Sequence, residues 1–314
     1  MVFSALTALV LTAAEVTSGE WAPGSEYPIG TRLTSSDATR SDAEAPVAGD
    51  PGIGAYFVAW SQRVAEVRAS QPEWLPPLMT LSPLLTELVR WDTYSQRVGN
   101  GEHSVNFGGG KGIFLVPTTS NEVDVGLPSY QRRDGPTPGA GWTDWQFLLV
   151  KQRLLSAGEA EGNYILTTAL AIQAPVGSQA FSNHTYVITP SLMGGKGFGD
   201  LNIQASTGVA IPTSYQPALG TTWSTNITAQ YRINHRLWPE LEANWTHWLN
   251  GSRDGLDQLF LTVGLLAGPV TITRELKVAF GMGYQFAVAP AQQPGPAQTP
   301  LYHNNLIFSA RVLF

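Results

Sequence analysis

The stretch that decides the fold is NNLIFSARVLF, from Asn304 to Phe314, at the C-terminal end of the chain. Apolar residues occupy every second position, and most positions between them are polar or charged. A period of two is the repeat of a β-strand, whose successive side chains point to opposite faces. An apolar face that ends in Phe fits the lipid-facing side of the last strand of a membrane barrel. The apolar face is Leu306, Phe308, Ala310, Val312 and Phe314, and the other carries Asn305, Ser309 and Arg311.

The segment from Leu276 to Val288 shows the same alternation with a stronger contrast. One face carries Leu, Val, Phe, Met and Tyr side chains, whereas the other is mostly Gly and Ala. In a soluble barrel the small face would meet water, and Gly and Ala make a poor solvated surface. Lipid outside and a narrow lumen inside account for both faces.

The chain from Leu84 onward divides into about twelve alternating segments separated by turn signals. Long connections alternate with mostly shorter ones, such as TTSN, GGKGFGD and NHRLWP, which we interpret as turns. This asymmetry and an even count are typical of outer-membrane barrels with both termini on the periplasmic side. We therefore predict an all-β, transmembrane, antiparallel up-and-down barrel over residues 84–314. Its segments are Leu85–Gln96, Gly112–Pro117, Glu122–Leu127, Trp142–Arg153, Asn163–Ala174, Thr185–Met193, Leu201–Ile211, Trp223–Ile233, Glu240–Trp248, Leu259–Leu266, Leu276–Val288 and the closing strand.

The composition agrees with a membrane barrel. Charged residues make up 13% of the 314 residues, compared with roughly 25% in soluble domains. No apolar run reaches the roughly 18 residues of a membrane-spanning helix. The net charge of −6 and the lack of a basic stripe argue against nucleic acid, so the expected partners are the lipid bilayer and a small-molecule solute. The absence of cysteine excludes disulfides, thiolate catalysis and cysteine-based zinc sites.

Three segments precede the barrel. Residues 1–20 contain an apolar stretch of signal-peptide length without a positively charged start, so we predict a signal peptide, with a disordered apolar tail as the alternative. Residues 21–50 have the composition of a disordered linker. Residues 51–83 combine an amphipathic helix over Ile53–Arg68 with a proline-rich, extended lead-in. The helix could lie beneath the barrel, fold into the lumen as a plug, or pack at the rim.

Several segments, in this order along the chain from Tyr56 to Phe314, carry a family resemblance. They are YFVAWSQRVAEVRASQPEWLPPLMTLSP, GGGKGIFLVP, WQFLLVKQRLLSAGEAEGNYILT, LMGGKGFGDLNIQASTGVAIPT, LWPELEANWTHW and the C-terminal strand. The chain resembles the outer-membrane protein family named for the meta-pathway of phenol degradation. The resemblance implies an outer-membrane channel or transporter of a Gram-negative-type bacterium, involved in uptake of aromatic or other hydrophobic compounds, without established catalytic residues. A terminal aromatic such as Phe314 is associated in bacteria with recognition by the barrel-assembly machinery, which we expect as a partner.

Charged residues on the non-lipid faces are expected to line the lumen. Arg232 could pair with Glu240 across neighbouring strands, and Asp92 and Arg311 would meet where the first and last strands close. These charges could form a constriction that selects solutes, or salt bridges that neutralise buried charge and stiffen the barrel. The predicted lumen residues are Arg90, Asp92, Arg232, Glu240, Glu242, Lys277 and Arg311.

Aromatic residues near the strand ends are expected to form two girdles at the membrane interfaces. The alternative is a set of core aromatics in a soluble β-sandwich. The predicted girdle residues are Trp91, Trp142, Trp223, Trp238, Trp248, Tyr302 and Phe314.

Motifs for catalysis or cofactor binding are not found. GGGKG from Gly108 and GGKGFG from Gly194 lack the phosphate-loop pattern, and the five histidines lack metal-ligand spacing. We therefore expect no enzyme activity, no cofactor and no metal. The predicted function is a channel or transporter that passes small hydrophobic or aromatic solutes through a narrow charged lumen. The alternative is a plugged structural or interaction barrel whose outer loops bind a partner.

Overall fold

The computed structural model describes residues 59–99, 101–109, 112–273, 276–289 and 301–314. The predicted signal peptide, the predicted linker and the first residues of the predicted helix lie outside these ranges. Within them, no helix is long and apolar enough to cross a membrane.

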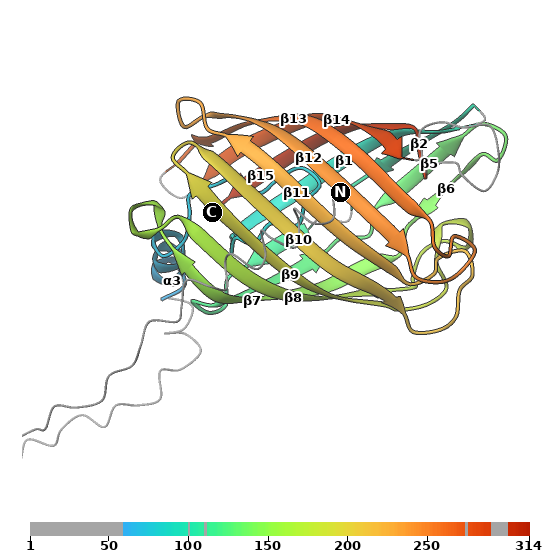
Figure 1. Ribbon diagram of the computed structural model, residues 1–314, viewed down its shortest axis with the longest axis horizontal. Coiled ribbons are helices and arrows are strands. Elements are labelled where there is room, and N and C mark those ends of the chain that lie inside the picture. The colour runs from blue at the N-terminus through green and yellow to red at the C-terminus, as the bar shows by residue number, and fades with distance from the viewer. Residues whose placement is uncertain (1–58, 100, 110–111, 274–275, 290–300) are drawn as a thin grey trace, which may run out of the picture. The chain divides into compact units, whose positions relative to one another are not determined.

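The described strands form one antiparallel sheet, and β1 pairs with β15 to close it into a barrel (Figure 1). The pairing at this seam joins Leu88–Arg97 to Asn304–Leu313. The predicted closing strand is therefore confirmed. The strands are β1 (Leu88–Gly99), β2 (Glu102–Phe107), β3 (Gly112–Leu115), β4 (Asn121–Gly126), β5 (Tyr130–Asp134), β6 (Gly139–Trp142), β7 (Trp145–Ala157), β8 (Tyr164–Ala174), β9 (Val187–Phe198), β10 (Leu201–Pro212), β11 (Thr222–Tyr231), β12 (Leu237–Trp248), β13 (Asp257–Thr271), β14 (Lys277–Ala289) and β15 (Asn304–Leu313).

Among the described residues the wall has twelve strand positions, because the second, third and fourth positions each consist of two strands. β2 pairs with one half of β1, and β3 pairs with the first residues of β1. β5 and β6 continue the layer beside β2, whereas β4 and β7 continue the layer beside β3. The predicted twelve-stranded antiparallel barrel is confirmed, but the predicted boundaries were wrong here. Segments assigned to loops contain β2, β5 and β6, since Gly99 and Gly101 before β2 and Pro128 before β5 interrupt the pattern before the strands resume.

The two ends of the barrel differ in the length of their connections. On the side of the first residue of β1 and the last of β15, the turn between β9 and β10 is only Gly199–Asp200. On the opposite side, residues 175–186 and 213–221 form longer connections. Short turns on the side of the termini are the rule for outer-membrane barrels. We therefore call the side of the termini the periplasmic end and the opposite side the outer end.

The GGKGFGD segment, predicted as a turn, is mostly strand. β9 extends to Phe198, and Gly195 and Gly197 lie within it. A Cβ atom built on Gly195 would lie 2.6 Å from the ring of Trp74, and one built on Gly197 would lie 2.0 Å from Asn163 Nδ2. The glycines therefore make room for neighbouring side chains rather than bend the chain.

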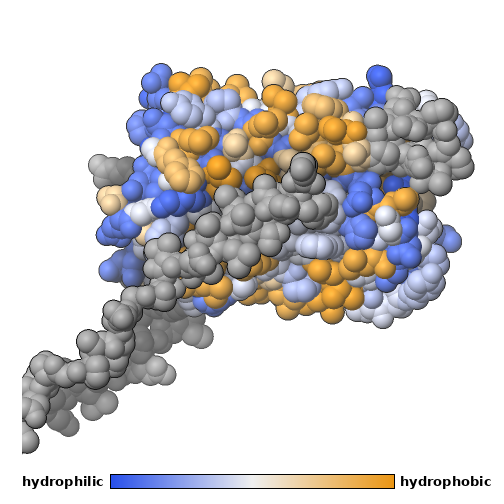
Figure 2. All heavy atoms as spheres, viewed as in Figure 1, coloured by the Kyte–Doolittle hydropathy of each residue, from blue (hydrophilic) through white to orange (hydrophobic). Residues whose placement is uncertain are grey.

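The outer wall is apolar, as the alternation predicted. On β14, Phe280 and Met282 are 60% and 54% exposed, whereas Gln285 is 1% exposed. On β15, Phe308 is exposed and Arg311 is buried. Figure 2 shows hydrophobic residues over much of the barrel wall. A closed barrel with an apolar exterior satisfies its backbone hydrogen bonds within a bilayer.

The described part of the N-terminal helix is α3 (Trp60–Ala69), at the periplasmic end of the barrel (Figure 1). Its Val64 and Val67 pack against Leu85 and Val116. Of the three predicted placements, folding into the lumen is wrong for the described part of this helix, which packs at the periplasmic end.

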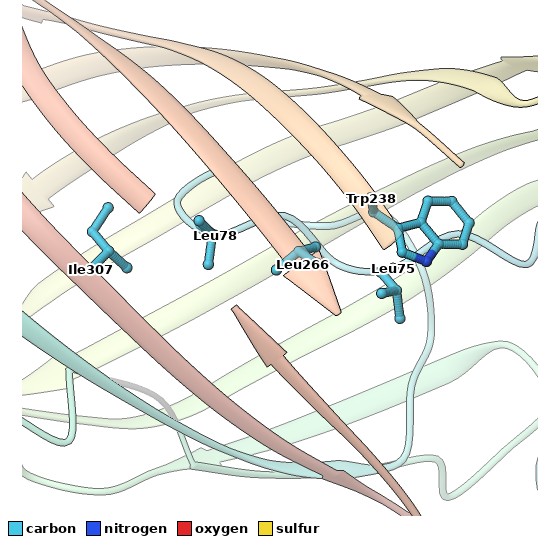
Figure 3. Packing of buried hydrophobic residues seen from close by; sticks show 5 residues of the cluster. All are labelled: Leu75, Leu78, Trp238, Leu266 and Ile307. Carbon is cyan, nitrogen blue, oxygen red and sulfur yellow. The ribbon is translucent and has the colours of Figure 1, made fainter. Parts of the chain in front are cut away.

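The segment Gln71–Glu87, which we call the plug, lies inside the barrel and has no helix or strand. Its Leu75 and Leu78 pack against Trp238, Leu266 and Ile307 of the wall (Figure 3). The proline-rich lead-in, and not the helix before it, therefore fills the lumen.

Candidate lumen site

Two arginines at the closing seam hold carbonyl groups of the plug. Arg90 on β1 and Arg311 on β15 lie opposite each other, and both are buried. Arg90 Nη2 donates to the carbonyl oxygen of Leu78 at 2.6 Å. Arg311 donates to the carbonyl oxygens of Pro76 and Pro77, the second at 3.1 Å. Three successive carbonyl groups thus accept charge-assisted hydrogen bonds, which are stronger than neutral ones.

Two glutamates of β12 hold the N–H groups that follow. Glu240 Oε1 accepts a hydrogen bond from the backbone nitrogen of Leu78 at 3.2 Å. Glu242 accepts from the backbone nitrogens of Met79 and Thr80, at 2.9 and 2.6 Å, and from the hydroxyl of Thr80 at 2.6 Å. We call the segment of residues 76–80 the plug tip. It is therefore hydrogen-bonded to the wall along its main chain.

Other wall residues position three of these four charged side chains. Asp92 accepts two hydrogen bonds from Arg90 Nε, at 3.0 and 3.1 Å. Gln230 donates to Glu240 at 2.8 Å. Thr228 donates to the second glutamate at 3.1 Å. Each of these partners belongs to a strand of the sheet. The charged side chains they contact are therefore held by the wall as well as by the plug tip.

Leu78 is the side chain of the plug tip that fits a shaped recess in the wall. Three glycines of β13 and β14, Gly264, Gly281 and Gly283, surround it. Cβ atoms built on them would lie 2.7, 2.7 and 2.6 Å from the methyl carbons of Leu78. Real Cβ contacts are essentially never that short, so a side chain at any of these positions would displace Leu78 from this recess, which we call the glycine recess. It also explains the small inward face of the strand over Leu276–Val288.

A second anchor holds the end of the plug near β1. Lys151 on β7 and Glu122 on β4 form an ion pair at 2.5 Å, with 2% and 0% of the side chains exposed. Lys151 Nζ also donates to the carbonyl oxygen of Leu84 at 3.3 Å, and Glu122 accepts from the backbone nitrogen of Thr86. Both ions of this pair therefore contact the plug.

The helix is attached at the periplasmic rim. Trp60 Nε1 donates to Glu87, and Arg68 Nη2 donates to the carbonyl oxygen of Phe314 at 2.6 Å. Burial raises the pKa of the Glu87 carboxyl, and the hydrogen bond from Trp60 and the charge of Arg68 oppose this rise. Burial also lowers the pKa of Arg68.

The structure brings five of the seven predicted lumen residues together around the plug tip. The Arg232–Glu240 pair was a wrong prediction. Arg232 follows the last residue of β11 and lies at the rim, where it donates to Glu159 at 2.6 Å and to Asp200 at 3.2 Å. Lys277, the first residue of β14, lies half-buried at the periplasmic end. The five residues around the tip are Arg90, Asp92, Glu240, Glu242 and Arg311.

The predicted aromatic girdle needs three corrections. Trp238 is buried in the lumen, where its Nε1 donates to the carbonyl oxygen of Gly268 at 3.1 Å. Trp248 is also buried, because it shares the inward side of β12 with Trp238. Tyr302 stacks on Phe260, with ring centroids 4.3 Å apart, and so turns away from the exterior. The exposed members of the set are Trp91, Trp142, Trp223 and Phe314.

Sequence reasoning missed the partners of the charges. The carbonyl and N–H groups of the plug tip have no signature in residue type, and neither does the location of a proline-rich segment. The glycines of β13 and β14 could have indicated the plug. An inward face without side chains leaves space in a narrow barrel, and protein interiors are close-packed, so another segment must occupy that space.

No protein-family model matches this chain, and none of the curated proteins matches it. Among solved structures, the COG4313 outer membrane channel from Pseudomonas putida F1 matches 77% of this chain and 100% of its own, with a TM-score of 0.50 and 12% identity. The fold is that of an outer-membrane β-barrel.

Two further barrels are less similar. The NanC porin matches 71% of this chain and 98% of its own, with a TM-score of 0.45 and 8% identity. OmpF of Salmonella typhi, in complex with daunomycin, matches 73% of this chain and 98% of its own, with a TM-score of 0.35 and 9% identity.

Proposed function

We propose that the protein is a channel of the bacterial outer membrane and that the plug is its gate. The observation that carries this proposal is how the plug is held. In the described chain the main-chain groups of the plug tip are bonded to wall side chains, and no backbone–backbone hydrogen bond joins the tip to a strand of the sheet. The tip can therefore leave its site without breaking a hydrogen bond of the barrel ladder. The charged constriction is open to solutes only in that displaced state, because Arg90, Arg311, Glu240 and Glu242 hold the plug tip in the closed one.

Small hydrophobic or aromatic solutes are the proposed cargo. The resemblance to the family named for the meta-pathway of phenol degradation supports this class. The lumen wall adds a physical reason, since Phe260 and Tyr302 form a stacked pair beside the amide of Gln285, which accepts from the Tyr302 hydroxyl at 2.5 Å. Aromatic rings and amides together suit a planar aromatic solute.

Single-channel conductance in planar bilayers tests the proposal. Leu78→Asp removes the side chain from the glycine recess and places a carboxylate near Glu240. The expected result is low conductance for the unmodified protein and frequent opening for the variant. Glu73→Gln, a change at an exposed plug residue, is the matched control. Chemical labelling can show whether the plug of a variant is displaced. If a variant with a displaced plug conducts no better than the control, the proposed channel function is refuted.

A second function is supported by the ordered outer end. Asp144, at the junction of β6 and β7, accepts hydrogen bonds from the backbone nitrogens of Gly177 and Asn183, at 3.1 and 2.6 Å. Ser178 N donates to the carbonyl oxygen of Trp142 at 2.8 Å. The connection between β8 and β9 is thereby fixed against β6 and forms a platform for a partner. Loss of partner binding in Asp144→Ala, with unchanged conductance, would favour this function over the channel.

A further inference from the structure

The wall recognises the plug tip as a peptide-binding protein recognises its ligand. Arg90 and Arg311 donate to three successive carbonyl groups, and Glu240 and Glu242 accept from three successive N–H groups. All six bonds involve main-chain atoms of the tip. Main-chain bonds supply affinity in peptide recognition, and side-chain pockets supply specificity.

Specificity at this site comes from two features. The glycine recess accepts the side chain of Leu78, which is 0% exposed. The two residues before it are prolines, which have no N–H and therefore present only carbonyl groups to Arg311. The preferred sequence is thus Pro-Pro-Leu followed by two residues with free N–H groups.

The site is built by the wall alone. Its charged groups lie on β1, β12 and β15, and its recess lies on β13 and β14. Asp92, Gln230 and Thr228 hold three of the four charged side chains from within the sheet. A site with this support keeps its shape when the plug leaves, as preorganised binding sites do.

We propose that the lumen contains a peptide-binding site whose resident ligand is the plug tip, and which accepts a separate Pro-Pro-Leu peptide once the tip is displaced. The site goes beyond the proposed channel activity. In the unmodified protein the tethered tip has a high effective concentration and excludes a free peptide.

The test uses the full chain in detergent micelles, so that its result does not depend on conductance. The double variant Leu78→Asp, Thr80→Pro weakens the resident tip, because it removes the recess contact and one N–H donor and leaves the wall unchanged. The probe is a fluorescein-labelled peptide of residues 73–82, EWLPPLMTLS, followed by fluorescence anisotropy. A scrambled peptide of the same composition measures binding to the micelle.

We expect saturable binding of the probe to the double variant and none to the unmodified protein or to Glu73→Gln. Replacing the leucine that follows the two prolines by alanine in the peptide is expected to weaken binding at least about tenfold, because a buried leucine contact is lost. Adding Arg311→Met to the double variant is expected to weaken it by at least about tenfold as well.

Equal binding of the native and scrambled peptides would overturn the proposal. So would the absence of binding to a double variant whose gel mobility shows a folded barrel. If that variant does not fold, Met79→Pro removes a single N–H donor, and the same two outcomes decide.

Discussion

Gly283→Ala is expected to loosen the plug by a predictable amount. A Cβ atom at this position would lie 2.6 Å from Leu78 Cδ1, whereas ordinary contacts begin at 3.4 Å. Leu78 must therefore retreat by about 0.8 Å, the difference of these distances, and Gly264 and Gly281 confine it on the other sides. Overpacking of this kind costs about 1–3 kcal/mol. Because the strain is relieved when the tip leaves, the displaced population should rise by about 5- to 150-fold.

Cysteine labelling measures that population. The chain has no cysteine, so Ser82→Cys, in the buried part of the plug, gives a single reactive thiol. Its rate of modification by a soluble maleimide follows the fraction of displaced plug when opening is fast. Gly283→Ala in this background should label about 5- to 150-fold faster than the background alone.

The matched control is Gly194→Ala on β9. A Cβ atom there would lie 3.4 Å from its nearest neighbours, which is an ordinary contact. An unchanged labelling rate in Gly283→Ala, or an equal increase in Gly194→Ala, would show that the recess does not hold the plug.

The remaining predictions concern the charged groups. Arg311→Met removes both donors to the proline carbonyls, so labelling at position 82 should be at least about tenfold faster, since bonds to charged groups contribute about 1.5–3 kcal/mol; a smaller change would contradict its role. Lys151→Met should lower the free energy of unfolding by about 3–5 kcal/mol because it leaves Glu122 buried and unpaired. Adding Glu122→Gln should restore part of that loss in a denaturant titration. Arg232→Ala should leave the ion selectivity of a displaced-plug channel unchanged, because its side chain is bonded at the rim. Burial raises the pKa of Glu87, so its contribution to docking of α3 should be present at acid pH and be lost as pH rises through the raised pKa. Glu87→Gln should abolish this dependence in the protease susceptibility of α3.

The wall could be predicted because lipid and lumen impose opposite demands on alternate residues. The pattern over Leu276–Val288 placed Phe280 outside and Gln285 inside, as observed. Extending the same parity along β12 would also have placed Trp238 and Trp248 inside with Glu240. The girdle prediction was wrong for these two residues because it considered only that they lie near the strand ends. It did not consider which face of the strand their side chains occupy.

The plug could not be predicted, because its contacts are made by main-chain atoms that every residue possesses. Prolines exclude regular structure but do not say where an irregular segment lies. The charges of Arg311 and Glu242 were correctly assigned to the lumen, and their partners were assumed to be other charges. The prediction that Arg232 lines the lumen was wrong for a local reason, because β11 ends one residue before it.

The plug enters and leaves the barrel at the same end, and this determines how it can be installed. Gln71 closes its base by donating to the carbonyl oxygen of Leu85 at 2.7 Å and accepting from the nitrogen of Leu85 at 3.1 Å. The segment is therefore a hairpin-like loop and not a thread through the pore. Since both ends of this loop lie at the periplasmic end, β1 and β15 can join first and the loop can be inserted afterwards. The same geometry allows a pull on α3 from the periplasm to withdraw the loop while the seam stays intact.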